Sequence, residues 1–234
     1  MASIEQIINR QFGMWEMQQK ERAVALEPSP PPPPIVTVSR EHGSRGSYLA
    51  SRLAEAMGYQ RLHREVIDSI CQSSGYRKHI IESLDEKYRS NITMLVESFL
   101  IGQAVHPVDY ARNLYLVILS MAELGGVVLV GRGGNFILGP EKGFHIRVVC
   151  PREKRVDNLI KYKAMEREEA IASIAESDLE RKELIRKMFG QDINNPCFYD
   201  LCINTARIDI EDIVPSILGA IDGKMKKLKH DPAV

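Results

Sequence analysis

The chain has 234 residues, of which 44% are hydrophobic and 26% are charged, a balance that is typical of a folded protein and excludes a wholly disordered one. Lys and Arg together number 31, as do Asp and Glu, so the formal charge is zero. Dedicated nucleic-acid binders usually carry a basic excess, so this balance argues against that class.

Targeting signals and cysteine spacing point to one compartment. The first ten residues lack the basic start and the apolar run of an export signal. The most apolar stretch, 114–130, contains Glu123 and two glycines, so we expect no membrane span. The four cysteines form no CxxC pair, and their spacing suggests neither a zinc site nor a disulfide framework. These features predict a cytoplasmic protein.

The chain divides into three parts. Residues 1–27 predict an amphipathic helix, with Trp15 and several isoleucines on one side. Residues 28–34 read PSPPPPP and predict an extended linker. Residues 35–234 form the main domain. The apolar side of the helix either packs on that domain or makes a contact with a partner, such as a homodimer. Deleting residues 1–34 is expected to leave a folded domain.

Strand and helix patterns alternate from residue 35 onward. Short β-branched or apolar runs predict strands, and the segments between them have helical spacing. The expected strands are 35–39, 59–62, 127–130, 144–150 and 200–204. A charged helical stretch covers 166–189, and a closing helix covers 210–228. This order predicts an α/β fold, a five-stranded parallel sheet with helices on both faces.

Ligands of such sheets bind beyond the carboxyl ends of the strands. Several turns expected at this edge carry arginine, and a rim of guanidinium groups suits a polyanion such as phosphate. The turns are Ser39–Ser47, His63–Glu65, Arg132–Asn135, Arg152–Arg155 and Asn204–Arg207.

The first of these turns is the most informative. A strand, a loop rich in Gly and Ser, and a helix together form a nest of N–H groups that can bind phosphate. The pattern GxxxxGK[ST] is absent, because no lysine occurs between Ser39 and Lys78. On its own, the loop fits a phosphate site or an ordinary turn between strand and helix equally well.

Three segments, in this order, resemble the cytidylate kinase-like family, a divergent branch of the P-loop nucleoside monophosphate kinases. They are TVSREHGSRG at 37–46, followed by a helix that ends at Gly58; VGRGGNFIL at 130–138; and YDLCINT at 199–205. The resemblance covers about residues 35–222. It implies a P-loop kinase-like fold with a helical lid, and ATP and Mg²⁺ as cofactors.

The resemblance also implies roles for residues. The loop from Gly43 to Ser47 would hold the donor phosphates, Arg132 would hold the acceptor monophosphate, and the lid-like stretch from Asp178 to Lys187 would close over them. The implied catalytic residues are Arg45, Arg132, Arg181 and Arg186. The implied nucleotide-binding residues are Ser39, Arg40, Gly43, Ser44, Gly46, Ser47 and Arg155.

This chain departs from the family at the phosphate loop. Gly46 stands where ordinary cytidylate kinases have the P-loop lysine, and Arg45 precedes it as a candidate replacement cation. The hydroxyl of Ser47, or that of Ser44, is the candidate on the magnesium side. His42, His63 and His145 do not form a spaced metal set, and Asn194 belongs to the loop that leaves the lid.

Two functions follow from the retained arginines and the missing lysine. The first is ATP-dependent phosphoryl transfer to a small phosphorylated acceptor, a nucleoside monophosphate such as CMP. The second is a nucleotide-binding regulatory module that is catalytically weak or inactive and acts through its N-terminal helix.

Overall fold

The computed structural model describes residues 3–24, 32–84, 86–100 and 108–230. The chain forms two compact units. The helical unit comprises residues 1–35 and 62–127, and the sheet unit comprises residues 36–61 and 128–234. The main domain expected over 35–234 therefore contributes residues to both units, and the N-terminal helix belongs to the helical unit.

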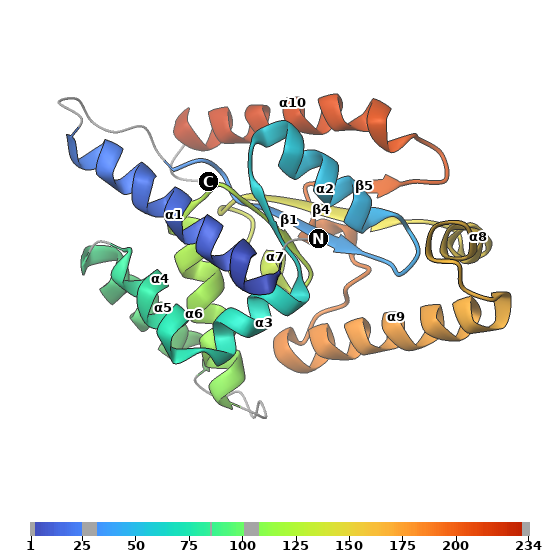
Figure 1. Ribbon diagram of the computed structural model, residues 1–234, viewed down its shortest axis with the longest axis horizontal. Coiled ribbons are helices and arrows are strands. Elements are labelled where there is room, and N and C mark those ends of the chain that lie inside the picture. Colours follow the sequence, from blue (N-terminus) through green and yellow to red (C-terminus); the bar gives the residue numbers. More distant parts are fainter. Residues whose placement is uncertain (1–2, 25–31, 85, 101–107, 231–234) are drawn as a thin grey trace. The chain divides into compact units, whose positions relative to one another are not determined.

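The sheet has five strands in the order β2-β3-β1-β4-β5 (Figure 1). They are β1 (Val36–Arg40), β2 (Gln60–Leu62), β3 (Val127–Val130), β4 (Phe144–Val149) and β5 (Leu201–Asn204). The central strand β1 runs parallel to β3 and β4, and β4 runs parallel to β5. Each predicted strand matches the observed one to within a residue at either end, because short apolar runs between turns are characteristic of buried parallel strands.

Helices cover both faces of the sheet within the sheet unit. On one face, Val36 and Val38 of β1 form a buried cluster with residues of α2 (Gly46–Met57) and α10 (Ile210–His230), which lie side by side in Figure 1. On the other face, α7 (Gly134–Leu138) lies against Thr37, whose Cγ2 would be 3.2 Å from a Cβ added at Gly134. The short helix α7 corrects the sequence analysis, which expected a turn as far as Asn135.

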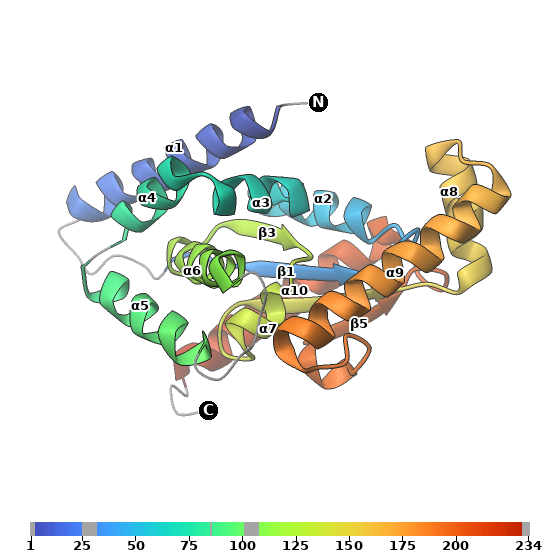
Figure 2. The ribbon, with the colours of Figure 1, turned by 90° about the horizontal axis from the view of Figure 1, so that it is seen from below.

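The charged segment after β4 folds as a helical hairpin. The helices α8 (Arg152–Lys163) and α9 (Arg167–Phe189) pack on each other through a small apolar core of their own (Figure 2). Ala164 joins them with a φ of 52°. The short 3-10 helix η1 (Pro196–Phe198) leads from the hairpin to β5. This hairpin is the predicted helical lid.

The described residues of the helical unit form five helices. They are α1 (Ile4–Val24), α3 (Arg64–Gln72), α4 (Ser74–Glu82), α5 (Glu86–Leu100) and α6 (Val108–Leu124). The core of this unit includes Ile67, Leu114 and Ile118, all fully buried. No helix in the described part of the chain is both long and apolar enough to cross a bilayer.

The N-terminal helix packs inside the helical unit. Trp15 is 1% exposed and its Nε1 donates a hydrogen bond to the Gly125 carbonyl at 2.9 Å. Phe12 is also buried, against Tyr76, although the sequence analysis did not single it out, whereas Ile4 is exposed. Of the two alternatives, packing within the chain or contact with a partner, the structure shows packing within the chain for Trp15 and Phe12. The homodimer stays a prediction.

The proline-rich segment lies largely outside the described residues. Of the expected linker at 28–34, only residues 32–34 are described. The Pro33 carbonyl accepts a hydrogen bond from the Gly126 N–H at 3.2 Å. This end of the segment is therefore tied to the helical unit by the main chain.

Candidate phosphate-binding site

The loop between β1 and α2 depends on two glycines. A Cβ at Gly46 would lie 2.6 Å from the Cβ of Arg40 and 3.0 Å from that of Val148, so only glycine lets α2 begin this close to the strands. Gly43 has a φ of +77°, and a Cβ there would lie 2.7 Å from the Arg155 carbonyl oxygen. The loop therefore lies directly against the first turns of α8.

Hydrogen bonds fix this loop to the ends of the neighbouring strands. The N–H of Glu41 donates to the Val148 carbonyl at 3.0 Å, and its carboxylate accepts from the N–H of Cys150 at 2.8 Å. On the other side, the hydroxyl of Thr205 donates to the Ser44 carbonyl at 2.8 Å. The loop is thus held by both β4 and the segment after β5.

The same loop leaves main-chain donors for a ligand. Arg45, with a φ of 60°, precedes the first residue of α2 and provides no side-chain cap. Within the described part of the chain, the N–H groups of Gly43, Arg45 and Ser47 have no hydrogen-bond acceptor. N–H groups at a helix N-terminus attract anions, because the helix dipole adds to their partial positive charge. The loop therefore has the properties of an anion site.

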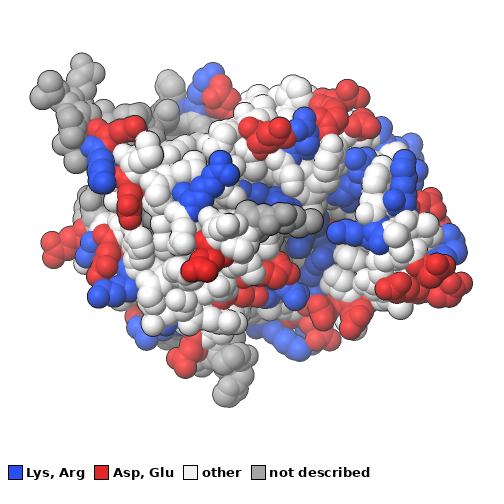
Figure 3. Space-filling model, viewed as in Figure 1, with Lys and Arg blue, Asp and Glu red and all other residues white. Residues whose placement is uncertain are grey.

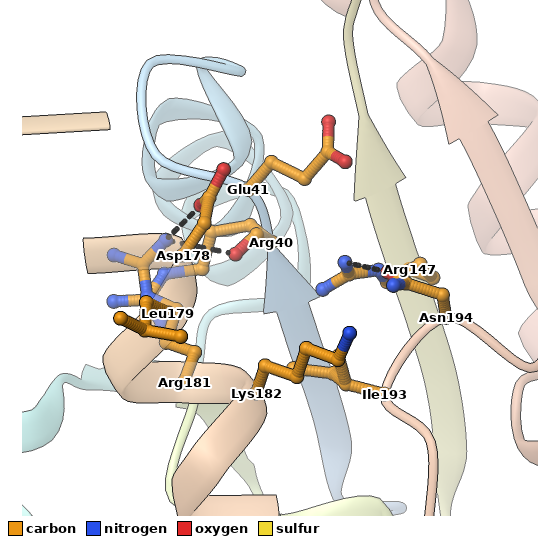
Figure 4. A pocket seen from close by; sticks show the side chains of 9 residues that line it. All are labelled: Arg40, Glu41, Arg147, Asp178, Leu179, Arg181, Lys182, Ile193 and Asn194. Carbon is orange, nitrogen blue, oxygen red and sulfur yellow. Dashed lines mark hydrogen bonds and ion pairs between the residues drawn. The ribbon is translucent and has the colours of Figure 1, made fainter. Parts of the chain in front are cut away.

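A cavity of about 280 Å³ lies beside this loop, at the carboxyl ends of β1 and β4. Four cationic side chains face it from three elements in Figure 4: Arg40 from β1, Arg147 from β4, and Arg181 with Lys182 from α9. The remaining lining residues are Glu41, Asp178, Leu179, Ile193 and Asn194. Four cations against two carboxylates make the cavity suitable for an anionic ligand.

Arg147 is the most deeply buried of the cationic groups, at 5% exposure. Its Nη1 donates to the Ser39 hydroxyl at 3.0 Å, and its Nη2 donates to the Asn194 side-chain oxygen at 2.9 Å. Its buried Nε has no hydrogen-bond partner among the described residues. A buried guanidinium is costly unless it is paired or bonded. Such a group beside the cavity points to a ligand-binding role.

A second arginine ties the lid to the loop. The Arg155 guanidinium, 10% exposed, forms an ion pair with Asp178 of α9, and its Nε lies 3.7 Å from the Glu41 carboxylate. Its Nη1 also donates to the His42 carbonyl at 3.3 Å. Arg181 donates to the Arg40 carbonyl at 3.0 Å. On the face drawn in Figure 3, Lys and Arg side chains gather where this loop, α8 and α9 lie.

Two histidines near these elements have pKa values below the ordinary one. Burial lowers the pKa of His42, the Arg181 charge lowers it further, and Asp178 opposes them. Burial also lowers the pKa of His145, whose Nδ1 and Nε2 lie 2.8 Å from the Thr37 hydroxyl and the Gly139 carbonyl. These bonds assign the proton of the His145 ring to Nε2. Both side chains make structural contacts.

The predicted catalytic arginines do not all reach the cavity. Arg181 lines it. The Arg45 guanidinium lies 4.9 Å and 5.0 Å from the ring centroids of Tyr48 and Tyr162. Arg132, with a φ of 56°, and the exposed Arg186 are not among its lining residues. Their catalytic roles stay predictions.

The predicted nucleotide-binding residues lie on or beside the loop. Arg40 lines the cavity, and Ser39 reaches it through Arg147. The fully buried Ser44 donates its hydroxyl proton to the Glu41 carbonyl at 2.8 Å, which gives it a role in the shape of the loop. Ser47 is exposed in the first turn of α2.

Arg147, Lys182 and Asn194 are among the cavity residues that were not predicted as site residues. Arg147 sits inside a strand whose apolar pattern concealed it, and Lys182 was one charge in a charged helix. Asn194 belongs to the loop that leaves the lid, yet its side-chain oxygen accepts a hydrogen bond from Arg147 and it lines the cavity. The one available signal for Arg147 as a site residue was an arginine within a strand that is otherwise largely apolar.

Magnesium would fit this site together with a bound nucleotide. Among the described residues, no group of three His, Cys, Asp or Glu side chains is arranged to hold a metal ion. Mg²⁺ in kinase sites keeps several waters and takes one or two protein ligands plus phosphate oxygens. The exposed hydroxyl of Ser47, at the start of α2, is compatible with that arrangement.

Comparisons with known proteins agree with this geometry. The model of the cytidylate kinase-like family matches residues 35–207. A cytidylate kinase of Pyrococcus horikoshii is 26% identical over 80% of this chain and 88% of its own length. One of Ignicoccus hospitalis is 24% identical over 78% of this chain and 96% of its own.

One solved structure supports the fold. An uncharacterized protein from Eubacterium ventriosum has a TM-score of 0.61 at 19% identity, covering 81% of this chain and 98% of its own. With the five-stranded parallel sheet, these matches confirm the predicted α/β, P-loop kinase-like fold. The chain belongs to the cytidylate kinase-like family.

Proposed function

We propose that this protein transfers a phosphoryl group from ATP, with Mg²⁺, to a small phosphorylated acceptor, a nucleoside monophosphate such as CMP. The observation that carries the proposal is the cavity whose cationic side chains come from β1, β4 and α9, beside a loop with unoccupied N–H groups. Phosphoryl transfer needs mainly positioning and positive charge around the moving group, and this cavity offers both. The cytidylate kinases among the relatives support the choice of acceptor.

Each part of the site takes a separate task in this proposal. The loop from Gly43 to Ser47 binds the donor phosphates through its N–H groups. Arg40, Arg181 and Lys182 surround the transferred group. The hairpin of α8 and α9 covers the site and excludes water, which limits wasteful hydrolysis of ATP. Arg132 binds the acceptor phosphate.

The absence of the usual loop lysine is compatible with activity. Arg45 was the expected replacement, but its guanidinium lies over two tyrosine rings. Lys182 and Arg40 line the cavity and bring cations to it from α9 and β1. We assign the work of the missing lysine to these two residues.

Magnesium would supply charge neutralisation of the phosphates when bound. The hydroxyl of Ser47 would be the ligand from this loop, as the resemblance implies. The chain's own residues would orient the phosphates and keep water out.

The second candidate is a nucleotide-binding regulatory module without turnover. It is favoured by the missing lysine and by the two carboxylates, Glu41 and Asp178, that face the cavity. Such a module would bind ATP and signal this binding to a partner through its N-terminal helix.

A coupled assay of ADP release, run over the common nucleoside monophosphates, tests the proposal beside calorimetry of ATP binding. Release that depends on one acceptor supports the kinase, whereas binding without release for every acceptor identifies the regulatory module. In the variant Arg132→Ala, acceptor use should weaken by roughly 2–4 kcal/mol, as for the loss of a charge-assisted contact in a closed site, while ATP affinity changes far less. An equal loss of ATP affinity would reject this division of roles.

A further inference from the structure

The carboxylate of Asp178 lies against the loop between β1 and α2, at the residue that precedes the proposed phosphate-binding stretch 43–47. Its Oδ1 accepts a hydrogen bond from the His42 N–H at 3.0 Å. Its Oδ2 pairs with Nη1 of Arg155, and Nη1 of Arg181 lies 3.7 Å from Oδ1. Figure 4 shows this side chain extending from α9 toward the end of β1.

These contacts match those of a bound phosphate oxygen. A main-chain N–H from a loop that precedes a helix, together with guanidinium groups, is a common donor set for phosphate. Asp178 receives the N–H from the loop and one guanidinium from α8, both distant in sequence, while the second guanidinium comes from Arg181, three residues further along α9. A carboxylate of the chain thus has the surroundings of a ligand anion.

The charge balance explains why an anion is present. Arg155 is only 10% exposed, and a buried guanidinium that loses its anionic partner is strongly destabilising. Glu41 is more distant, 3.7 Å from the Arg155 Nε, and its carboxylate also accepts the N–H of Cys150. Asp178, whose side chain is 31% exposed, can return to water when another anion takes its place.

We propose that Asp178 is an internal competitor that occupies a phosphate position on the loop and must withdraw when the donor phosphates bind. This inference rests on the proposed function, since it takes the loop as the donor site. It makes Asp178 a positioning residue that couples α9 to nucleotide binding. Nucleotide affinity is then lower than the loop and its arginines alone would give.

Removing the charge of Asp178 while keeping its shape tests the inference. Asp178→Asn retains an oxygen that can accept the His42 N–H, and Glu176→Gln removes the same charge from an exposed position on the same helix. Calorimetry is done on the full chain with tripolyphosphate, which has no base, and with ATP. We expect Asp178→Asn to bind both probes at least fivefold more tightly than the unaltered chain, and Glu176→Gln to stay within twofold.

The outcomes separate this inference from the proposed function. If the unaltered chain binds the probes and Asp178→Asn binds them equally or more weakly, the inference is overturned and the proposed function stands. If no variant binds either probe, the loop is no donor site and both fail.

Thermal melting and a second variant guard against a folding defect in Asp178→Asn. Without ligand, Asp178→Asn should melt at a lower temperature, because Arg155 loses its anionic partner, and tripolyphosphate should raise its melting temperature more than that of the unaltered chain. If Asp178→Asn does not fold, Asp178→Ser takes its place with the same expected gain. A smaller rise than in the unaltered chain contradicts the inference.

Discussion

An arginine in the middle of a buried strand carries much of the site. Arg147 of β4 is 5% exposed, and it links Ser39 of β1 to Asn194 of the loop after α9. A buried guanidinium is costly unless its N–H groups find acceptors, and the two acceptors that bind Arg147 also fix the wall of the cavity. Arg147 therefore both places a positive charge beside the cavity and holds the cavity wall in shape.

The buried His145 gives stability a dependence on pH. Its pKa lies below the ordinary value, mainly because burial disfavours the charged ring, and Lys224 acts in the same direction. Below about pH 6.5 the unfolded chain takes up the proton first, so stability falls as the pH is lowered, by up to about 1.4 kcal/mol per pH unit for one group. His42 adds an effect of the same sign.

Urea unfolding at pH 7.5 and pH 5.5 measures this dependence. The unaltered chain should lose more unfolding free energy between these pH values than His145→Gln does, since the substitution removes one of the two rings whose pKa is lowered on folding. An identical loss in both proteins would show that His145 does not titrate as its burial requires.

Arg45 should matter less for ATP than the resemblance implies. Its guanidinium rests over Tyr48 and Tyr162, and it does not line the cavity. We expect Arg45→Ala to change ATP affinity by less than about threefold, below 1 kcal/mol, as for an exposed contact of this kind. Calorimetry at low salt checks this, and a loss of tenfold or more would restore Arg45 as the replacement for the lysine.

At the scale of elements, the junction of β1 and α2 depends on glycine. Alanine within a helix is normally favoured over glycine by roughly 0.5–1 kcal/mol. At Gly46, however, a Cβ would overlap the Cβ of Arg40 at 2.6 Å, so Gly46→Ala should destabilise the chain by about 1–3 kcal/mol. Gly219 of α10 has no atom within 4 Å of its added Cβ, so Gly219→Ala should stabilise by about 0.5–1 kcal/mol. Urea unfolding measures both, and effects of the same sign would contradict the packing described.

The sequence predicted elements better than it predicted the site. Strands such as 127–130 were recognisable because apolar runs of this length fit a buried parallel sheet. The short helix α7 was missed, since glycines at 133 and 134 resemble a turn. Lys182 and Asn194 were missed because the cavity forms only when α9 folds back on the ends of β1 and β4, a contact that no local pattern encodes. The contact of Arg45 with Tyr162 was not foreseeable for a related reason, because this tyrosine on α8 is distant in sequence.

At the scale of the whole molecule, the N-terminal helix is part of a core. Ile8, Phe12 and Trp15 are buried in the helical unit, so removing residues 1–34 takes away part of that core. We now expect the truncated chain to be less stable, which revises the expectation from the proline-rich segment alone.

A single substitution measures this contribution. Trp15→Ala should lower the unfolding free energy by about 3–5 kcal/mol, as for other large buried aromatic residues. Met17, on the same helix, is 64% exposed, and Met17→Ala should stay within about 0.5 kcal/mol. Circular dichroism during urea unfolding follows both, because Trp15 is the only tryptophan and its fluorescence is lost with it. Equal effects would mean that α1 contributes no core.

Calorimetric titration of ATP with Mg²⁺ tests most directly whether the cavity beside the β1 loop binds the phosphates. The unaltered chain should bind ATP, and Arg181→Ala, which removes a cation from the cavity, should bind it at least tenfold more weakly, about 1.4 kcal/mol. Arg167→Ala, which removes an exposed charge paired with Glu153 on the same hairpin, should bind ATP as the unaltered chain does. Equal affinity in all three proteins, or no binding by the unaltered chain, would contradict a phosphate site in this cavity.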